Sequence, residues 1–289
     1  MRKLNLTDPE GSQIKYTVSN FPDGQQSITI DNYEYGDSDW IQIQSRFNSF
    51  KDLELIICAT QALREMGLNK IHLYVPYFLG ARSDRKFGKG GFNYIKSVVA
   101  PIINLQKYES VTCIDPHSDV LEACINNFKK INNVELVNFA LFHIHGSTSA
   151  WKKDYPFTLV SPDAGALKKV YEVAEAIGYT KDIIIASKHR DLKTGAITHT
   201  EVPVHSQHAN QKFVIVDDIC DGGRTFIEIS KVIRRHFADA EIYLVVTHGI
   251  FSKGTETLKI DFDGIFCTDS YQSIESNDPF VKQLKVYGK

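Results

Sequence analysis

The sequence predicts two doubly wound α/β domains, because short apolar runs alternate with helical segments and because this alternation occurs twice. The apolar runs are rich in β-branched and aromatic residues, which is typical of parallel strands buried on both faces. They lie at 72–78, 110–115, 182–188, 212–218 and 241–249. Apolar residues recur at helical spacing in segments 52–67, 92–105, 164–178 and 224–237. Elements of these lengths favour parallel sheets with right-handed crossovers.

A polar break separates the two halves of the pattern. Residues 143–156 contain Gly, Ser and Pro and show no periodicity. We therefore expect an N-terminal domain at 1–143 and a C-terminal domain at 144–289. A chain of 289 residues is long enough for two modest domains.

Composition narrows the class of protein. The formal net charge is -2, and the 43% hydrophobic and 24% charged residues are ordinary for a folded protein, so bulk charge favours neither a nucleic-acid nor a membrane partner. No segment resembles a signal peptide or a membrane span, and we expect a cytoplasmic protein. The 5 cysteines are an odd number without CxxC spacing, which indicates reduced packing residues.

The strongest motif follows the apolar run at 212–218 and leads directly into a predicted helix. Its glycines allow close backbone approach, and the first amides of the helix are suited to hold a phosphate. Adjacent carboxylates suit two neighbouring ribose hydroxyls, or a metal that bridges to them. A sharp turn with an acidic N-cap is the alternative. The candidate residues are Asp217, Asp218, Asp221, Gly222, Gly223, Arg224 and Thr225.

Together with other segments, this motif resembles the ribose-phosphate diphosphokinases, also called phosphoribosyl pyrophosphate synthetases. More distantly, it resembles the type I phosphoribosyltransferases, which share the loop. The other matching segments are VPYFLGARSDRKF (75–87), IDPHSD (114–119), VSPDAGALKKV (160–170), SKHRDLKTG (187–195), FPDGQQSITI (21–30) and THGIFSKG (247–254). The resemblance covers nearly the whole chain and implies two similar domains of the type I phosphoribosyltransferase kind. It also implies an ATP-dependent diphosphotransferase.

The resemblance assigns ATP and Mg²⁺ to the first group of motifs. Arg82, Ser83 and Asp84 would contact ATP, although a solvated turn is the alternative for this segment. Asp115 and His117 would border the ATP phosphates and hold Mg²⁺ directly or through water. Imidazole is an unusual ligand for this hard cation, and a lone histidine at a strand end is more often a core or cap residue.

The resemblance also implies residues near the transferred group. Asp163 would help to place the metal on the sugar side, and a helix N-cap is its alternative role. Lys188 and Arg190, together with His117, would be catalytic. Both cations follow a predicted strand in a polar segment, as expected of a closing loop that stabilises the diphosphate. A solvated run of charges is the alternative.

A third set of residues, in the segment FPDGQQSITI, implies that the protein forms a homo-oligomer. Phe21, Asp23 and Gln25 resemble family residues that reach adenine from a neighbouring subunit, where Phe21 would stack on the base and Asp23 would accept from its amino group. A homodimer or a larger homo-oligomer would then be needed to complete the ATP site. A plain turn is the alternative for FPDG.

The sequence departs from the family at three of these positions. The usual loop has threonine after its third acid and then two glycines, whereas here the glycines come first and Arg224 follows. Arg224 either projects into solvent or reads an additional phosphate, as on the distal ribose of ADP-ribose. Ser83 stands where the family usually has glutamine, and Gln25 where it often has glutamate, so adenine recognition differs.

The leading hypothesis is Mg²⁺-dependent transfer of diphosphate from ATP to ribose 5-phosphate, giving 5-phosphoribosyl 1-diphosphate and AMP. One alternative is the same transfer to ADP-ribose, in NAD-related metabolism. Another is a catalytically silent regulatory partner of a synthetase. A type I phosphoribosyltransferase is less expected, since such an enzyme would not need the separate ATP motifs.

Overall fold

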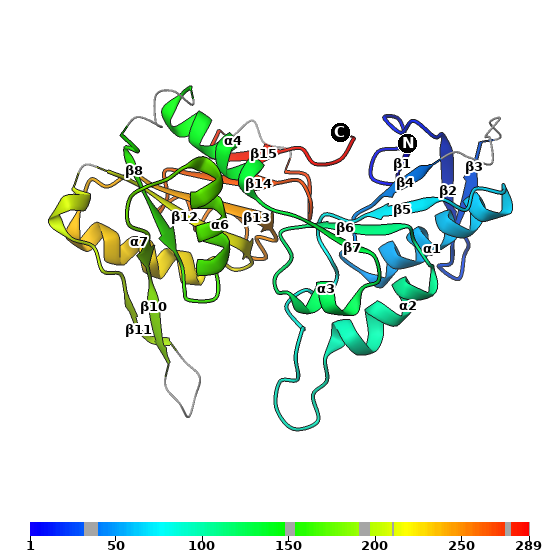
Figure 1. The fold of residues 1–289 in the computed structure, drawn as a ribbon, viewed down its shortest axis with the longest axis horizontal. Helices are drawn as coiled ribbons and strands as arrows, with labels where there is room; N and C mark the ends of the chain where they lie inside the picture. The colour runs from blue at the N-terminus through cyan, green and yellow to red at the C-terminus, as the bar shows by residue number, and fades with distance from the viewer. Residues whose placement is uncertain (32–39, 148–153, 191–196, 210, 275–278, 289) are drawn as a thin grey trace. The chain divides into compact units, whose positions relative to one another are not determined.

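The computed structural model of the chain describes residues 1–31, 40–147, 154–190, 197–209, 211–274 and 279–288. These residues form two compact units (Figure 1). The first comprises 1–132 together with 285–289, and the second comprises 133–284. Each unit is built on its own parallel sheet, which confirms the prediction of two doubly wound domains.

The first unit contains a 5-stranded sheet in the order β1-β4-β5-β6-β7, and every neighbouring pair of strands is parallel. Helices connect β4 to β5, β5 to β6 and β6 to β7, and an antiparallel hairpin, β2–β3, packs beside α1. The strands are β1 (Arg2–Asn5), β2 (Tyr16–Asn20), β3 (Gln26–Ile30), β4 (Ile41–Gln44), β5 (Ile71–Tyr74), β6 (Ser110–Ile114) and β7 (Phe128–Ile131). The helices are α1 (Phe50–Glu65), the π-helix η1 (Ile95–Val99), α2 (Ala100–Leu105) and α3 (Val120–Cys124).

Local sequence explains where α1 begins and where β5 ends. Ser49 and Asp52 form a capping box, in which the Asp52 amide donates to Ser49 Oγ (3.2 Å) and the Ser49 amide donates to Asp52 Oδ2 (2.8 Å). The expected strand at 72–78 stops at Tyr74, because Pro76 has no amide hydrogen to continue the ladder. The residues after Tyr74 are therefore a loop at the carboxyl end of the sheet.

The second unit contains a 6-stranded parallel sheet in the order β15-β14-β13-β12-β8-β9. A separate antiparallel ribbon joins β10 to β11. The strands are β8 (Phe157–Ser161), β9 (Ile184–Ile185), β10 (Ser187–Arg190), β11 (Ile197–Glu201), β12 (Lys212–Cys220), β13 (Ile242–Gly249), β14 (Gly264–Thr268) and β15 (Val281–Leu284). The helices are α4 (Val134–His145), α6 (Leu167–Ile177), the 3-10 helix η2 (Ser206–His208) and α7 (Arg224–His236).

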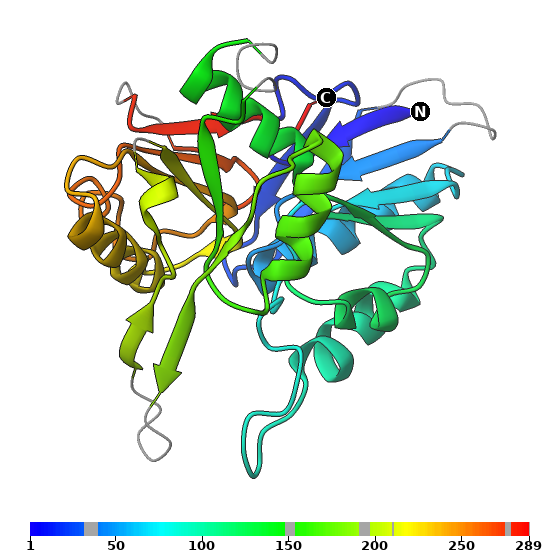
Figure 2. The ribbon, with the colours of Figure 1, turned by 60° about the vertical axis from the view of Figure 1, so that its left-hand side comes forward.

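Helices cover both faces of this second sheet. Alternate side chains of β12, an interior strand, pack against the helices on opposite faces. Phe213 and Ile215 of β12 belong to the apolar cluster that includes the buried face of α7. Val214 and Val216 belong to the cluster that includes α4 and α6. Figure 2 shows α6 in green and α7 in gold on opposite faces of the sheet. Burial on both faces explains the continuous apolar run that predicted this strand.

The boundary predicted at residue 143 is wrong, because it falls inside α4. Leu136, Val137, Ala140 and Leu141 of this helix pack in the same apolar cluster as Phe157 of β8. The helix therefore belongs to the second unit, which begins at residue 133. The predicted break extended to 156, and residues 148–153 of it lie outside the described residues.

The last described residues return to the first unit. Tyr74 donates its hydroxyl hydrogen to the carbonyl of Val286 (3.1 Å), and the Gly288 amide donates to Gln44 Oε1 (3.0 Å). The Tyr74 and Tyr287 rings meet edge to face with centroids 6.3 Å apart. The chain therefore passes between the two units twice.

Two expectations from composition can be compared with the structure. Cys58, Cys113, Cys124, Cys220 and Cys267 are all free thiols, and none of them is fully exposed. This agrees with the prediction that they are reduced packing residues. Among the described residues, no helix combines the length and the apolar character needed to cross a membrane.

Candidate active site

The acidic and glycine-rich segment lies at the carboxyl end of β12. The strand continues through Cys220, and α7 begins at Arg224 directly after the turn. Asp217 is half-buried, Asp218 is buried and Arg224 is exposed. Within the described residues no side chain caps the N-terminus of α7, so its first-turn amides remain suited to an anion.

The two glycines of this segment serve different needs. Gly223 has a φ of +76°, a left-handed conformation that favours glycine, and it forms the entry to α7. A Cβ on Gly223 would also lie 2.7 Å from Leu258 Cδ2. Gly222 does not adopt a positive φ, and a Cβ there would meet only the Lys253 side chain, at 3.6 Å or more. The fold itself therefore requires glycine at 223 but not at 222.

Three carboxylates meet at the ends of the neighbouring strands β8 and β12. The pKa of Asp217 is raised well above its ordinary value of 3.8, because the side chain is desolvated and because Asp218 and Asp163 lie nearby. Asp218 is paired with Lys169 of α6, whose Nζ lies 3.0 Å from Asp218 Oδ2. The site thus holds one paired acid beside an acid that is costly to ionise.

Asp163 shapes the turn that precedes α6. Its Oδ1 accepts hydrogen bonds from the amides of Gly165 (3.0 Å) and Ala166 (3.1 Å). The expected N-cap role is thus close to what the structure shows, although the helix itself begins at Leu167. This turn is what holds Asp163 near Asp217. Asp221 and Thr225, the other members of the predicted set, are half-buried in the turn and in the first turn of α7.

The segments with Arg82–Asp84 and Asp115–His117 follow β5 and β6, which are neighbouring strands of the first sheet. Asp115 directly follows β6, is only 2% exposed and has a φ of 44°, a left-handed conformation that aspartate tolerates better than most residues. His117 is exposed two residues later. The two candidate metal ligands therefore have different environments, since Asp115 is buried and His117 is exposed.

Arg82, Ser83 and Asp84 lie in the loop after β5. Arg82 is exposed, whereas Ser83 and Asp84 are half-buried. The Ser83 carbonyl accepts from the amide of Tyr94 (3.0 Å), and the Asp84 carbonyl accepts from the side chain of Asn93. These bonds close the base of the loop that runs from 83 to 94, so Ser83 and Asp84 have a clear structural role in addition to the predicted contact with ATP.

Phe21, Asp23 and Gln25 form the turn between β2 and β3. The Phe21 amide donates to the carbonyl of Gln25 (2.8 Å), and Asp23 Oδ1 accepts from the Gln25 amide (3.1 Å). Phe21 is 52% exposed. The turn is thus well ordered by its own hydrogen bonds, and it presents an exposed ring.

Lys188 and Arg190 belong to β10, where the prediction placed an irregular loop. Their backbones pair with Thr200 and Ile197 of β11. The strand expected at 182–188 is instead divided into β9 and β10, because the chain leaves the sheet after Ile185 and enters the antiparallel ribbon. Gly195, the remaining part of the predicted loop, lies outside the described residues.

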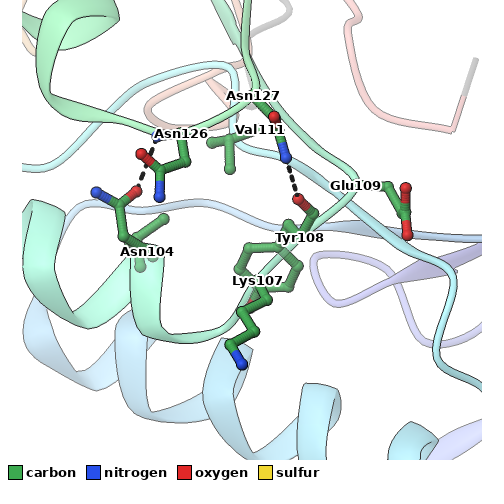
Figure 3. A pocket seen from close by; sticks show the side chains of 8 residues that line it. Asn104, Lys107, Tyr108, Glu109, Val111, Asn126 and Asn127 are labelled. Carbon is green, nitrogen blue, oxygen red and sulfur yellow. Dashed lines mark hydrogen bonds between the residues drawn. The ribbon is translucent and has the colours of Figure 1, made fainter.

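Two cavities among the described residues lie near the amino ends of the strands, one in each unit, whereas the candidate residues follow the carboxyl ends. A cavity of about 210 Å³ is lined by residues that precede β6 and β7, including Lys107, Tyr108 and Asn127 (Figure 3). In Figure 3, Asn127 donates to the Tyr108 carbonyl (3.0 Å), so its side chain serves the local turn. The second, of about 280 Å³, includes Thr158 at the amino end of β8. Neither cavity coincides with the candidate residues.

Sequence reasoning missed two lysines near the sugar-side loop. Lys169 stands in the matched segment VSPDAGALKKV, but only the packing of α6 against β12 brings it to Asp218. Lys253 stands in the matched segment THGIFSKG, and only the fold brings it to Gly222. In both cases the sequence offered one signal: a lysine that follows a strand-end acid or glycine within a few residues.

The described residues contain no group of three or more His, Cys, Asp and Glu side chains arranged to hold a metal ion. The hard oxygen donors and the crowding of Asp163, Asp217 and Asp218 nevertheless fit Mg²⁺, because a divalent cation would relieve their repulsion. Mg²⁺ commonly binds through one or two carboxylates together with water and substrate phosphates. A complete cage of protein ligands is therefore not required.

Comparison with known proteins supports the fold and the family. The phosphoribosyl transferase domain family matches residues 126–287. A ribose-phosphate pyrophosphokinase of Cereibacter sphaeroides is 30% identical over 83% of this chain and 68% of its own length. One from Marinomonas sp. is 28% identical over 99% of this chain and 87% of its own length.

The solved structures include a phosphoribosylpyrophosphate synthetase from Mycobacterium smegmatis. It is similar with a TM-score of 0.76 at 17% identity, covering 94% of this chain and 86% of that one. At this identity the likeness concerns the fold, and it confirms the predicted type I phosphoribosyltransferase architecture. The chain therefore belongs to the ribose-phosphate pyrophosphokinase family of ATP-dependent diphosphotransferases, as the order of its motifs predicted.

Proposed function

We propose that the protein transfers diphosphate from ATP to the anomeric hydroxyl of ribose 5-phosphate, giving 5-phosphoribosyl 1-diphosphate and AMP. The observation that carries this proposal is the segment after β12, where adjacent carboxylates precede an uncapped helix N-terminus and a glycine without a structural requirement. The names of the relatives support the same reaction.

The acceptor binds, in this proposal, along the segment from Asp217 to Thr225. The 5-phosphate lies against the first amides of α7 and the backbone at Gly222, where no Cβ interferes. Asp217 and Asp218 accept hydrogen bonds from the two ribose hydroxyls. Lys169 lies 3.0 Å from Asp218 Oδ2, so the acceptor site includes a cation beside this carboxylate.

The ATP side uses residues of the first unit. Arg82 pairs with a phosphate, and Ser83 and Asp84 hold the loop that carries it. His117, which is exposed, faces the ATP phosphates, and Phe21 stacks on adenine in a neighbouring subunit. The 52% exposure of Phe21 supports this role, because an exposed aromatic ring is available to a partner. A homodimer is the smallest assembly that supplies it.

In the chemical step, the anomeric oxygen of the sugar attacks the β-phosphorus of ATP. A new oxygen–phosphorus bond forms, the bond between the β-phosphorus and the bridging oxygen of the α-phosphate breaks, and AMP leaves with that oxygen. The anomeric hydroxyl releases its proton to solvent. Because charge gathers on the transferred group, Lys188 and Arg190 are proposed to stabilise it once the substrates are bound.

Magnesium has a specific place in this proposal. Asp163 and Asp217 would hold a cation on the sugar side, while His117 and Asp115 would contact the ATP-side cation through water. When bound, Mg²⁺ neutralises phosphate charge. The 2% exposure of Asp115 supports an indirect role, since direct coordination would need an open carboxylate.

A second acceptor, ADP-ribose, is favoured by one observation. Arg224 is exposed at the first position of α7 and has no hydrogen bond or ion pair among the described residues. Such a guanidinium suits a second phosphate beyond the one held by the helix amides. The names of the relatives compared above refer to ribose-phosphate, so ribose 5-phosphate remains the leading acceptor.

The test incubates the purified protein with Mg²⁺, ATP and either acceptor, and follows AMP and the diphosphorylated product by mass spectrometry. We expect AMP with ribose 5-phosphate and none after chelation of Mg²⁺ with EDTA. Turnover with ADP-ribose alone would replace the leading acceptor. No AMP with either acceptor would refute the enzymatic proposal and favour a silent regulatory partner.

A variant tests the catalytic assignment. Lys188→Ala should lower kcat on the order of 100-fold with little change in KM, if its charge acts in the transition state. Lys231→Ala, which removes a lysine on the surface of α7, is the matched control. A Lys188→Ala enzyme with unchanged kcat would contradict the role.

A further inference from the structure

A turn after β13 is fastened to the end of β12, next to the acceptor segment. The amides of Ile250 and Phe251 both donate to the carbonyl of Cys220, at 2.9 and 3.1 Å. Phe251 is buried, and its ring fills the space beside Gly249, where a Cβ would come within 2.2 Å of it. Because buried packing and hydrogen bonds both hold this turn, the residues that follow have a defined position.

Lys253 lies on this turn, and its side chain covers Gly222. The Cδ and Cε atoms of Lys253 are each 3.6 Å from the point where a Gly222 Cβ would stand. The Gly254 amide donates to the carbonyl of Phe251 (2.8 Å), which closes the turn around the lysine. Lys253 is exposed, and within the described residues its ammonium has no hydrogen bond or ion pair.

The charges around Lys253 indicate that its ligand is an anion. The segment itself carries Asp217, Asp218 and Asp221, yet the lysine pairs with none of them, and Lys169 already neutralises Asp218. A phosphate that reaches the α7 amides across this acidic surface needs a nearby cation. Lys253 can supply one without a conformational change of the backbone, because its aliphatic stem already packs on the glycine.

We propose that Lys253 is a positioning residue that holds the 5-phosphate of the acceptor over Gly222. This inference rests on the proposed function, and it adds a residue from a different strand end to the acceptor site. The inference also explains why residue 222 is glycine. A side chain at this position would separate the Lys253 ammonium from the backbone that binds the phosphate. Lys253 binds the substrate and takes no part in bond making.

The experiment measures initial rates of AMP formation against ribose 5-phosphate at saturating ATP. Losing one charged hydrogen bond to phosphate should raise the KM of Lys253→Ala for ribose 5-phosphate about tenfold. We expect kcat and the KM for ATP to stay within about twofold. Lys253→Arg should restore most of the affinity, and Lys231→Ala, which removes another exposed lysine, should match the wild-type protein.

The outcome can be read even if the proposed function fails. A KM for ribose 5-phosphate that Lys253→Ala leaves unchanged, or an equal rise in the KM for ATP, overturns the inference. If the wild-type protein forms no AMP, calorimetric titration with ribose 5-phosphate alone replaces the rate assay. Weaker binding by Lys253→Ala then supports the inference, whereas equal binding, or no binding by the wild-type protein, overturns it.

Discussion

Replacing Lys169 with methionine removes the cation that faces Asp218 and keeps the length of the side chain. The two groups are 3.0 Å apart, and their side chains are only 15% and 7% exposed. At an effective dielectric constant of about 20, a pair at this distance attracts by about 5.5 kcal/mol. Most of this gain is offset by the cost of desolvating both ions.

The loss on removing one partner is larger than the net value of the pair, because Asp218 would remain buried beside Asp217. Breaking a buried ion pair typically costs about 3–5 kcal/mol. We expect about 2–4 kcal/mol for Lys169→Met, since Lys169 keeps some contact with solvent. The double variant Lys169→Met/Asp218→Asn removes both charges and should recover most of the stability.

Urea unfolding followed by circular dichroism gives the free energy, and hydrogen exchange at the β12 amides reports on the second unit alone. A Lys169→Met protein within about 0.5 kcal/mol of wild type would show that solvent already screens this pair. A double variant as unstable as the single one would show that the lysine acts through packing. Either result would refute the electrostatic reasoning.

Three further predictions concern neighbouring groups. Gly223→Ala should cost roughly 1–3 kcal/mol in urea unfolding because of its φ of +76°, whereas Gly222→Ala should stay within about 0.5 kcal/mol. Asp217→Asn should stabilise the metal-free protein by about 1 kcal/mol at neutral pH, since the raised pKa makes ionisation unfavourable in the fold. The gain should vanish below the ordinary pKa of 3.8, grow as pH rises from 3.8 to the raised pKa, and level off above it. Thr60→Val removes the 2.7 Å partner of the buried Tyr108 hydroxyl, and thermal or urea unfolding should show a loss of about 1–3 kcal/mol.

Four central strands, β5, β6, β12 and β13, were predicted from apolar runs, whereas the central strands β4, β8 and β14 were not. The segment at 212–218 reads as a continuous apolar run, and it forms β12. The edge strands β7 and β15 gave no such signal, because charged or amide residues interrupt their sequences, FKKI and VKQL. The edge strand β9, in contrast, lies within the predicted run at 182–188. The fold class could therefore be predicted, while the width of each sheet could not.

The same distinction holds for the candidate site. Residues that directly follow a parallel strand, such as Asp115 and Asp217, reach the carboxyl edge of a sheet because of the topology alone. The partners of these residues come from elsewhere, since Lys169 approaches from α6 and Lys253 from the turn after β13. Such pairings depend on how helices and turns pack, which spacing along the chain does not encode.

The return of residues 285–289 to the first unit bears on how the protein folds during synthesis. The Gln44 side chain and the Tyr74 hydroxyl of the first unit bond to Gly288 and Val286. A ribosome makes those two residues only after the whole of the second unit has been synthesised. The first unit is thus the first to be synthesised and the last to be completed. Its hydrogen bonds to Val286 and Gly288 can form only after the second unit has been synthesised.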